Sequence, residues 1–152
     1  MSRTRLVWAV VAAGALAGSV STGLAWAGGP GGTIEDPEDV SAAVGTGTFE
    51  DFSDGPAGQS FEVGFTATGD TNDEASAAVI AACQAAGGVD CTSDEVTNDN
   101  LCIVSVGSDL KDIVAGGAGP TVEAARQDAI NRAAANNTPL GEDAVVIVSN
   151  CP

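Results

Sequence analysis

Acidic side chains are the residues of this sequence with the greatest capacity for chemistry. The chain has 152 residues, of which 21 are Asp or Glu, and some of these lie close together as Asp70/Asp73/Glu74 and Asp94/Glu95. Two carboxylic acids on either side of a glycosidic bond are the usual machinery of sugar hydrolysis. In a chain with this many acids such groups also arise by chance, so we interpret both as solvated surface charge.

Oxygen ligands at close spacing suggest calcium binding as a second chemistry. Asp70, Asn72 and Glu74 alternate as the first ligands of a calcium-binding loop do. The segment lacks the glycine and the distal glutamate of such a loop, and Thr71 with Glu74 forms the T-x-x-E pattern that caps a helix. We therefore expect a helix start at this place and no metal site.

The glycines of Gly116–Gly119 lie where a strand leads into a helix, a position at which anions can bind. Only Lys111 lies nearby to offset the acidity, and the G-x-G-x-x-G spacing is incomplete. We interpret these glycines as residues that allow close packing.

The composition excludes several classes of function. The chain has no His and no Tyr, and its formal net charge is −16. Without His there is no His-activated nucleophile and no His-ligated metal. Polyanions are bound through Lys and Arg, so neither nucleic acid nor an anionic membrane surface is expected as a partner. We expect no catalytic residue, no metal and no cofactor, and we favour a protein that is not an enzyme.

Residues 1–27 have the three parts of a secretory signal peptide. Arg3 and Arg5 provide a positive start, residues 6–20 are apolar, and Ala25-Trp26-Ala27 is a small-x-small cleavage pattern. Cleavage after Ala27 would leave three basic residues against all 21 acids, a net charge of −18. The sequence thus predicts a secreted, extracellular protein with no stable membrane anchor after cleavage.

Four cysteines remain in the exported chain: Cys83, Cys91, Cys102 and Cys151. An even number of cysteines in an oxidising compartment predicts disulfides. Their separations of 8, 11 and 49 residues are unlike the closely spaced ligand pairs of zinc sites. Two bridges are therefore expected, and the spacing leaves all three pairings open.

The elements that would position these residues form an internal repeat of fifty residues. Gly69-Asp70-Thr71 aligns with Gly119-Pro120-Thr121, and each threonine precedes an Ala-rich helical pattern that ends at Gly87-Gly88 or at Asn136. The expected strands are Val40–Thr46, Phe61–Ala67, Cys91–Val96, Leu101–Val106, Asp112–Ala118 and Ala144–Val148.

The order of these elements is strand-strand-helix-strand, used twice. It predicts an α+β fold in which the two helices pack on one face of a mostly antiparallel sheet. Residues 40–152 would form this single disulfide-bonded domain, residues 28–39 an acidic flexible tail and residues 51–59 a polar loop.

A family resemblance covers about residues 41–152. It is carried by small residues and cysteines at fixed spacing: Ala75-x-x-Ala78-Val79-x-x-x-Cys83, Cys91, Asn100–Gly107, Gly116-x-x-Gly119-x-Thr121, Ala125, Ala129-Ile130 and Cys151. This pattern resembles the small secreted bacterial proteins grouped as domain of unknown function 4189. In that family the cysteine near a helix end pairs with one that opens the next strand. The resemblance therefore implies a Cys83–Cys91 bridge, which leaves Cys102 for Cys151, and it implies no activity and no catalytic residues.

These observations predict a secreted small domain that acts as a non-enzymatic binding or cell-envelope-associated module. Its partner would be an extracellular or envelope component that the sequence does not specify. The alternatives are a weak carboxylate-based hydrolase and a calcium-dependent extracellular protein that binds divalent cations weakly. Two carboxylates about 5–9.5 Å apart in a cleft would favour the hydrolase, whereas acids spread over a convex surface would favour the module.

The acidity predicts a stability that depends on salt. Repulsion among the 21 acids opposes the compact state, and salt shortens the range of that repulsion from ~10 Å at 0.1 M to ~3 Å at 1 M. We expect the Tm to rise between low and molar NaCl, as measured by thermal unfolding. A constant Tm would contradict salt adaptation and would leave solubility as the role of the charge.

Overall fold

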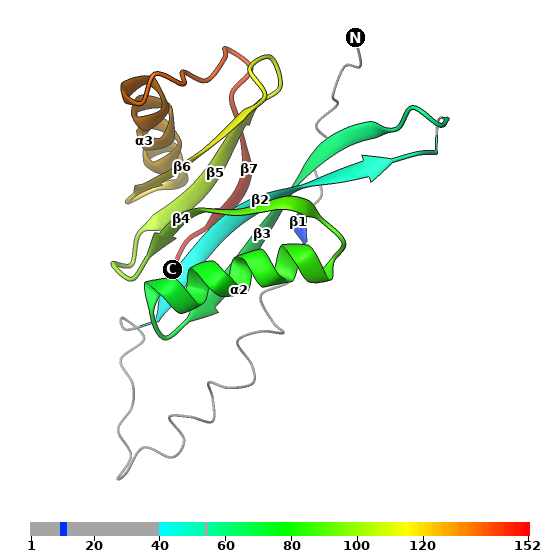
Figure 1. The fold of residues 1–152 in the computed structure, drawn as a ribbon. Coiled ribbons are helices and arrows are strands. Elements are labelled where there is room, and N and C mark those ends of the chain that lie inside the picture. Colours follow the sequence, from blue (N-terminus) through cyan, green and yellow to red (C-terminus); the bar gives the residue numbers. More distant parts are fainter. Residues whose placement is uncertain (1–9, 12–39, 54) are drawn as a thin grey trace.

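The computed structural model describes residues 10–11, 40–53 and 55–152 (Figure 1). The elements in chain order are β1 (Val10–Val11), β2 (Ser41–Asp51), β3 (Gln59–Gly69), α2 (Asn72–Ala85), β4 (Val89–Thr97), β5 (Cys102–Ser108), β6 (Ile113–Gly119), α3 (Val122–Ala135) and β7 (Val145–Asn150). Strand β1 lies inside the expected signal peptide. The rest of that peptide and the expected tail at 28–39 lie outside the described residues.

The predicted repeat and the α+β class are confirmed, because β2-β3-α2-β4 is followed by β5-β6-α3-β7. The two helices have 14 residues each, and their buried positions match at the offset of fifty. In α2 these positions are Ala75, Val79 and Cys83, and in α3 they are Ala125, Ala129 and Ala133. Each helix therefore buries the same narrow stripe of small side chains.

Each helix begins in the same way. Thr71 accepts a hydrogen bond from the backbone N–H of Glu74, and Thr121 accepts one from that of Ala124. Glu74 also accepts from the backbone N–H of Asp70, the residue before the cap, and not from that of Thr71 as in the predicted capping box. Of the three acids at the start of the first helix, Asp70, Asp73 and Glu74, the last thus has a structural role.

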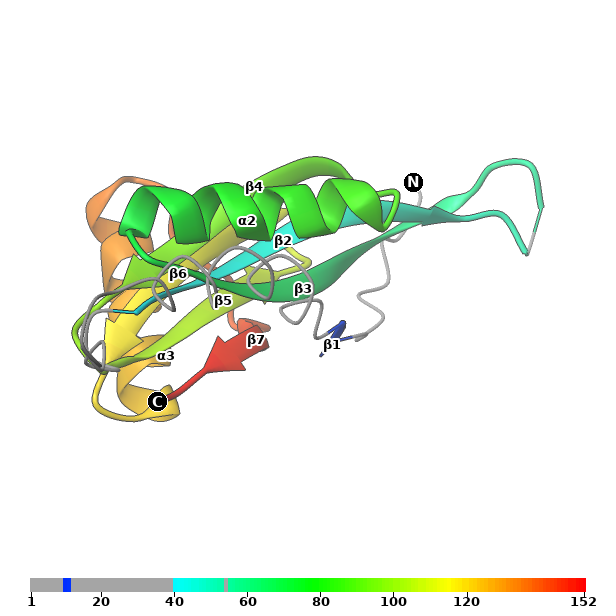
Figure 2. The same cartoon turned by 90° about the horizontal axis from the view of Figure 1, so that it is seen from below.

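The expected single sheet with both helices on one face is not found. The chain forms two sheets, with strand orders β1-β3-β2-β4 and β6-β5-β7, and neighbouring strands are antiparallel apart from β1 with β3. Helix α2 packs on the first sheet and α3 on the second (Figures 1 and 2). The order of elements was the same in both arrangements, so the sequence pattern did not distinguish them.

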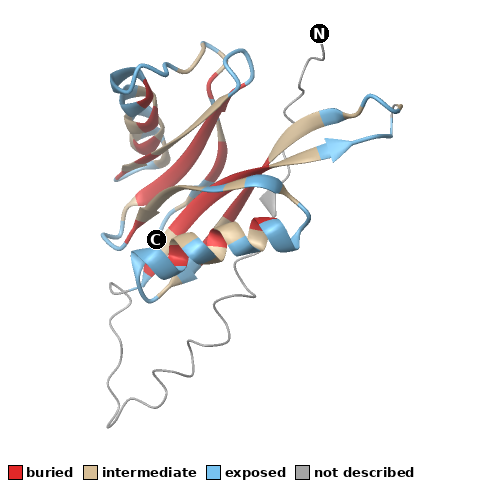
Figure 3. Ribbon diagram, viewed as in Figure 1, coloured by how far each residue is buried: buried red, intermediate tan, exposed pale blue. Residues whose placement is uncertain are grey.

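The two sheets pack against each other on the faces opposite to their helices. Strand β2 contacts β5, β3 contacts β7 and β4 contacts β6, so the two units are related by an approximate two-fold axis. Val44, Ile103 and Val148 form a buried cluster at this seam. Separate clusters lie under α2 and under α3. Burial is accordingly concentrated on the strands and on the inner faces of the helices (Figure 3).

A β-bulge occupies the same position in both units. The pairing of β2 with β4 skips Asp94, and the pairing of β5 with β7 skips Ile147. A bulge bends and twists its strand. The two bulges therefore bend the last strand of each unit at corresponding places along the seam.

The disulfides join Cys83 to Cys91 and Cys102 to Cys151. These are the two pairs that the family resemblance implied. The first ties the end of α2 to β4, and a Cβ on Gly47 of β2 would lie 2.1 Å from the Cys83 sulfur. The second ties the start of β5 to the residue after β7. Each unit therefore carries one bridge of its own, at a different place.

The hairpin between β2 and β3 is longer than predicted. Strand β2 extends to Asp51 and β3 starts at Gln59, in an unbroken register of eleven residue pairs. Phe49 stacks with Phe61 and Phe65 within the first unit, with ring centroids 5.9 and 6.1 Å apart. The aromatic side chains thus stiffen the first hairpin.

Close approach at the seam predicts that Gly116 is intolerant of substitution. A Cβ on Gly116 would lie 1.9 Å from the carbonyl oxygen of Asp94, which is backbone and cannot swing away. We expect Gly116→Ala to lower the free energy of unfolding by about 1–3 kcal/mol in denaturant titrations. Ala134→Ser, on the exposed face of α3, is the control and should change it by no more than ~0.5 kcal/mol. Equal stability of Gly116→Ala and wild type would contradict the sheet-to-sheet packing.

Candidate functional site

A small acidic pocket lies at the seam between the two units. It is formed by Glu62 of β3 and by the turn region between β5 and β6, and its volume is about 50 Å³. The residues that line it besides Glu62 are Gly107, Ser108, Asp109, Asp112, Ile113 and Val114. The two hairpins diverge on this side of the molecule (Figure 1), and both contribute residues to the lining of the pocket.

Alternation along β3 explains why Glu62 is at the seam. Val63 and Phe65 belong to the core under α2. Successive side chains of a strand point to opposite faces, so Glu62 faces the second sheet. Thr48 lies directly across β2, and its Oγ1 donates to Glu62 Oε1 at 2.7 Å. Glu62 also corresponds to Asp112 at the repeat offset of fifty, so equivalent positions of the two units both contribute an acid to the pocket.

The environment of Glu62 raises the pKa of its carboxyl group above the ordinary value. Burial is the main cause, and the charges of Asp94, Asp112 and Asp90 add to it. The hydrogen bond from Thr48 opposes the shift. Glu62 therefore holds a proton more readily than a free glutamate does.

Asp143 lies near the same turn and shows the opposite behaviour. The Ser108 hydroxyl donates to its Oδ1 at 2.6 Å and the backbone N–H of Leu110 donates to its Oδ2 at 2.9 Å. These two bonds lower the pKa of Asp143. Glu62 and Asp143 thus have pKa values displaced in opposite directions, as a general acid and its ionised partner do in hydrolytic sites.

The volume of the pocket limits its chemistry. One water needs ~10–15 Å³ of such space, so about 50 Å³ holds a few waters and not a sugar ring. The pocket can hydrate Glu62 and can exchange its proton with solvent. It offers no room for a saccharide between Glu62 and Asp112.

The acid pair Asp94/Glu95 singled out in the sequence serves in structural bonds. Asp94 accepts hydrogen bonds from Thr92 and, across the seam, from Ser105, both at 2.7 Å. Glu95 pairs with Arg132 of α3, which also pairs with Asp128 at 2.7 Å. Arg132 therefore joins an acid of its own helix to an acid of the first unit and forms a bridge between the two units.

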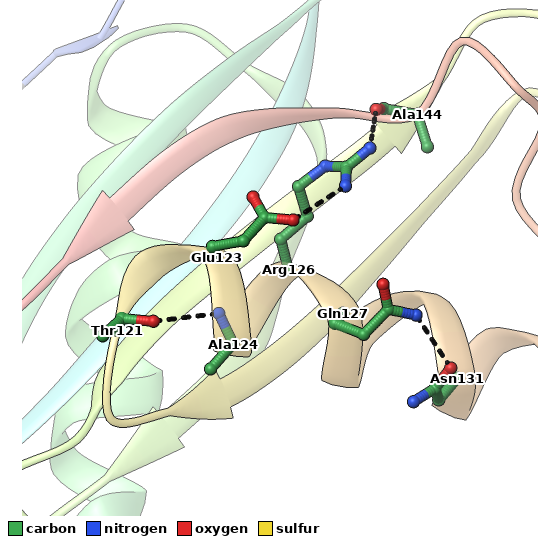
Figure 4. Close-up of polar contacts among 7 residues, drawn as sticks. All are labelled: Thr121, Glu123, Ala124, Arg126, Gln127, Asn131 and Ala144. Carbon is green, nitrogen blue, oxygen red and sulfur yellow. Dashed lines mark hydrogen bonds and ion pairs between the residues drawn. The ribbon is translucent and has the colours of Figure 1, made fainter.

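The other arginine of α3 is also bound within the chain. Arg126 donates to the carbonyl oxygen of Ala144 at 3.0 Å and pairs with Glu123 at 3.3 Å (Figure 4). The Gln127–Asn131 bond on the same helix is a local surface contact at 3.1 Å. Both guanidinium groups of the described chain are therefore neutralised by its own acids and carbonyls.

The glycines before α3 are packing residues, as the sequence suggested. A Cβ on Gly117 would lie 2.1 Å from the carbonyl oxygen of Ala125, and one on Gly119 would lie 2.8 Å from the nitrogen of the same residue. The helix backbone thus rests directly on β6. Gly69 has the same relation to the nitrogen of Ala75 in the first unit, at 2.6 Å.

Among residues 40–53 and 55–152, no three His, Cys, Asp or Glu side chains are grouped to hold a metal ion. No helix in the part of the chain that the structure describes is long and apolar enough to cross a bilayer.

A second pocket, of about 200 Å³, lies on the seam where β2 and β5 begin. Its lining is free of charged residues and comprises Val40, Ala42, Thr68, Thr97, Asn100, Leu101, Asn150 and Pro152. It is larger than the Glu62 pocket but carries no acid or base, so it offers packing and hydrogen bonds and no catalytic group.

Two disulfide-bonded ββαβ units packed sheet to sheet define this chain as a small duplicated α+β protein. The family described as Domain of unknown function (DUF4189) matches residues 53–151. The chain belongs to this family. No curated protein and no solved structure matches the chain.

The sequence did not reveal the pocket at Glu62, because nothing local to β3 shows that its polar face meets a second sheet. The signal that could have revealed it is the fifty-residue spacing between Glu62 and Asp112. That spacing has meaning only once the units are known to face each other across β3 and β7 and across β4 and β6.

The raised pKa of Glu62 predicts a stability that depends on pH. A group whose pKa is raised in the folded state stabilises the fold at low pH, and this contribution is lost as the pH rises through the folded pKa. Glu62→Gln stays uncharged and can still accept from Thr48. We expect its Tm at pH 7 to exceed that of wild type by about 1–3 °C, and the difference to vanish below the ordinary pKa of 4.5.

Glu142→Gln, at an exposed acid before β7, is the matched control for this experiment. It should leave the Tm within ~1 °C of wild type at both pH values. A difference for Glu62→Gln that does not change with pH would contradict the assignment of the effect to ionisation.

Proposed function

We propose that the chain is an exported, disulfide-stabilised binding module of the bacterial cell envelope or exterior and that it is not an enzyme. The observation that carries the proposal is the use of its carboxylates. Glu74 caps a helix, Asp94 and Glu95 join the two units, and Asp143 holds the turn before β6. These four acids therefore hold the fold together and are not gathered in a cleft as a catalytic pair would be.

Export is supported by two independent features. The leader has the charge, apolar core and cleavage pattern of a signal peptide. Both cysteine pairs are bridged, and such bridges persist in oxidising compartments outside the cytoplasm.

The carboxylate hydrolase is the weaker candidate. Glu62 and Asp143 have the opposed pKa directions that such an enzyme needs. The pocket at Glu62, however, is too small for a sugar ring at about 50 Å³.

The surface carries an excess of acids, so the partner that it favours is neutral or basic.

The export half of the proposal predicts a processed protein with two disulfides. A full-length gene expressed in a bacterium should yield protein outside the cytoplasm with the mass of residues 28–152 and no free thiol, as read by non-reducing mass spectrometry. Ala27→Phe should keep the leader, because the residue before the cut must be small. Trp26→Phe is the matched control and should be processed as wild type. Unprocessed wild-type protein with free thiols would overturn the proposal.

The binding half is tested with the processed protein and native envelope and culture fractions. A binding module should retain one saturable partner that molar NaCl weakens. Release of reducing sugar from envelope saccharides, abolished by Glu62→Gln, would instead establish the hydrolase.

A further inference from the structure

Without β1, which belongs to the leader, the two sheets have four outer strands, β3, β4, β6 and β7. The chain closes the last three of these with its own side chains or with bulges. The backbone N–H of Ala118 on β6 donates to Asp128 at 3.0 Å, so α3 covers that strand. Strand β4 is bulged at Asp94. Strand β7 is bulged at Ile147, and the carbonyl oxygen of Ala144, the residue before the strand, accepts a hydrogen bond from Arg126. Such features keep sheet edges from pairing with other chains.

Strand β3 is the exception among the described strands. It pairs with β2 over eleven residues without a bulge, and it contains no proline and a single charged residue, Glu62. Its outer edge is paired instead with β1, in parallel, through Val10 with Gly64 and Val11 with Phe65 (Figure 2). The edge therefore accepts an extended apolar segment, and the segment seated there belongs to the leader.

We propose that the outer edge of β3 at Gly64–Phe65 binds an extended segment of a partner protein, apolar with basic flanks, as an added parallel strand. The inference rests on the proposed function, since export removes Val10–Val11 and vacates the edge. Backbone hydrogen bonds would supply the affinity in this mode, and alternate side chains would supply the selectivity.

The chemistry of the occupant follows from the surroundings of the edge. Val63 and Phe65 are buried beside it under α2, so apolar side chains on the added strand continue the core. The processed chain has three bases against 21 acids. A second copy of the chain would be repelled by this charge, whereas basic flanks would be attracted. The leader itself has this composition, with Arg3 and Arg5 before its apolar stretch.

The probe is a synthetic peptide of residues 3–14, added to the processed wild-type protein. Intact mass first establishes that the leader is gone, so a failure of export is recognised before any peptide is added. We expect saturable binding and at least ~10-fold slower hydrogen exchange of the β3 amides, with the amides of β7 unchanged. The same peptide N-methylated at Val10 and Val11 should bind at least ~10-fold more weakly, because it cannot donate those hydrogen bonds.

Two further arms localise and challenge the site. The uncleaved Ala27→Phe protein carries its own strand and should bind the peptide more weakly than the processed protein. A peptide with Arg3→Glu and Arg5→Glu should also bind more weakly at low salt. The proposal is overturned if the peptide does not bind, if N-methylation has no effect, if protection falls on another strand, or if the processed protein is a dimer that already protects β3.

Discussion

The close contact between the two sheets is the constraint on which the rest of the structure depends. Each unit has one face covered by its helix, and its other face would be exposed without the second unit. Residues with little or no side chain allow the contact: a Cβ on Gly64 would lie 2.5 Å from Val148, and Gly116 lies against the backbone of Asp94. The seam then buries Val44 and Ile103 completely. Because one unit alone leaves an apolar sheet face in water, the duplication is itself a condition of stability.

The same seam decides what the acids do. A chain with 21 acids and five bases has few cations with which to neutralise them. It uses hydroxyls and backbone N–H groups instead, as at Asp94 with Ser105 and at Asp143 with Leu110. Its two described arginines lie on one helix, and Arg132 is directed across the seam to Glu95. The remaining half-buried acid, Glu62, has no cation beside it. Burial, reinforced by the charges of Asp94, Asp112 and Asp90, raises its pKa, and the hydroxyl of Thr48 only partly opposes the shift.

The fold was predictable to the level of elements. The helices follow from threonine caps and a stripe of alanines, and the strands from β-branched runs. All except β2 lie close to the predicted bounds. The extension of β2 to Asp51 was not predicted: the expected strand ended at Thr46 and the polar loop was expected to begin at residue 51. The stacking of Phe49 on Phe61, which supports the longer hairpin, joins residues of two strands and is visible only in the folded chain. The acidic pocket was not predicted either, because it joins Glu62 to residues some fifty positions away.

The sequence by itself determined the repeat, the α+β class, the helix caps and the acidity, since each depends on residues close together in the chain or on composition alone. Only the tertiary structure decided that the units stack as two sheets rather than joining into one. Alternation marks which strand residues share a face, but it does not show whether the face opposite the helix meets water or a second sheet. In the sequence the two cases differ only by a few small residues, such as Gly64 and Gly116. The outer edge of β3 likewise belongs to the tertiary structure, because an edge exists only once the neighbours of a strand are settled.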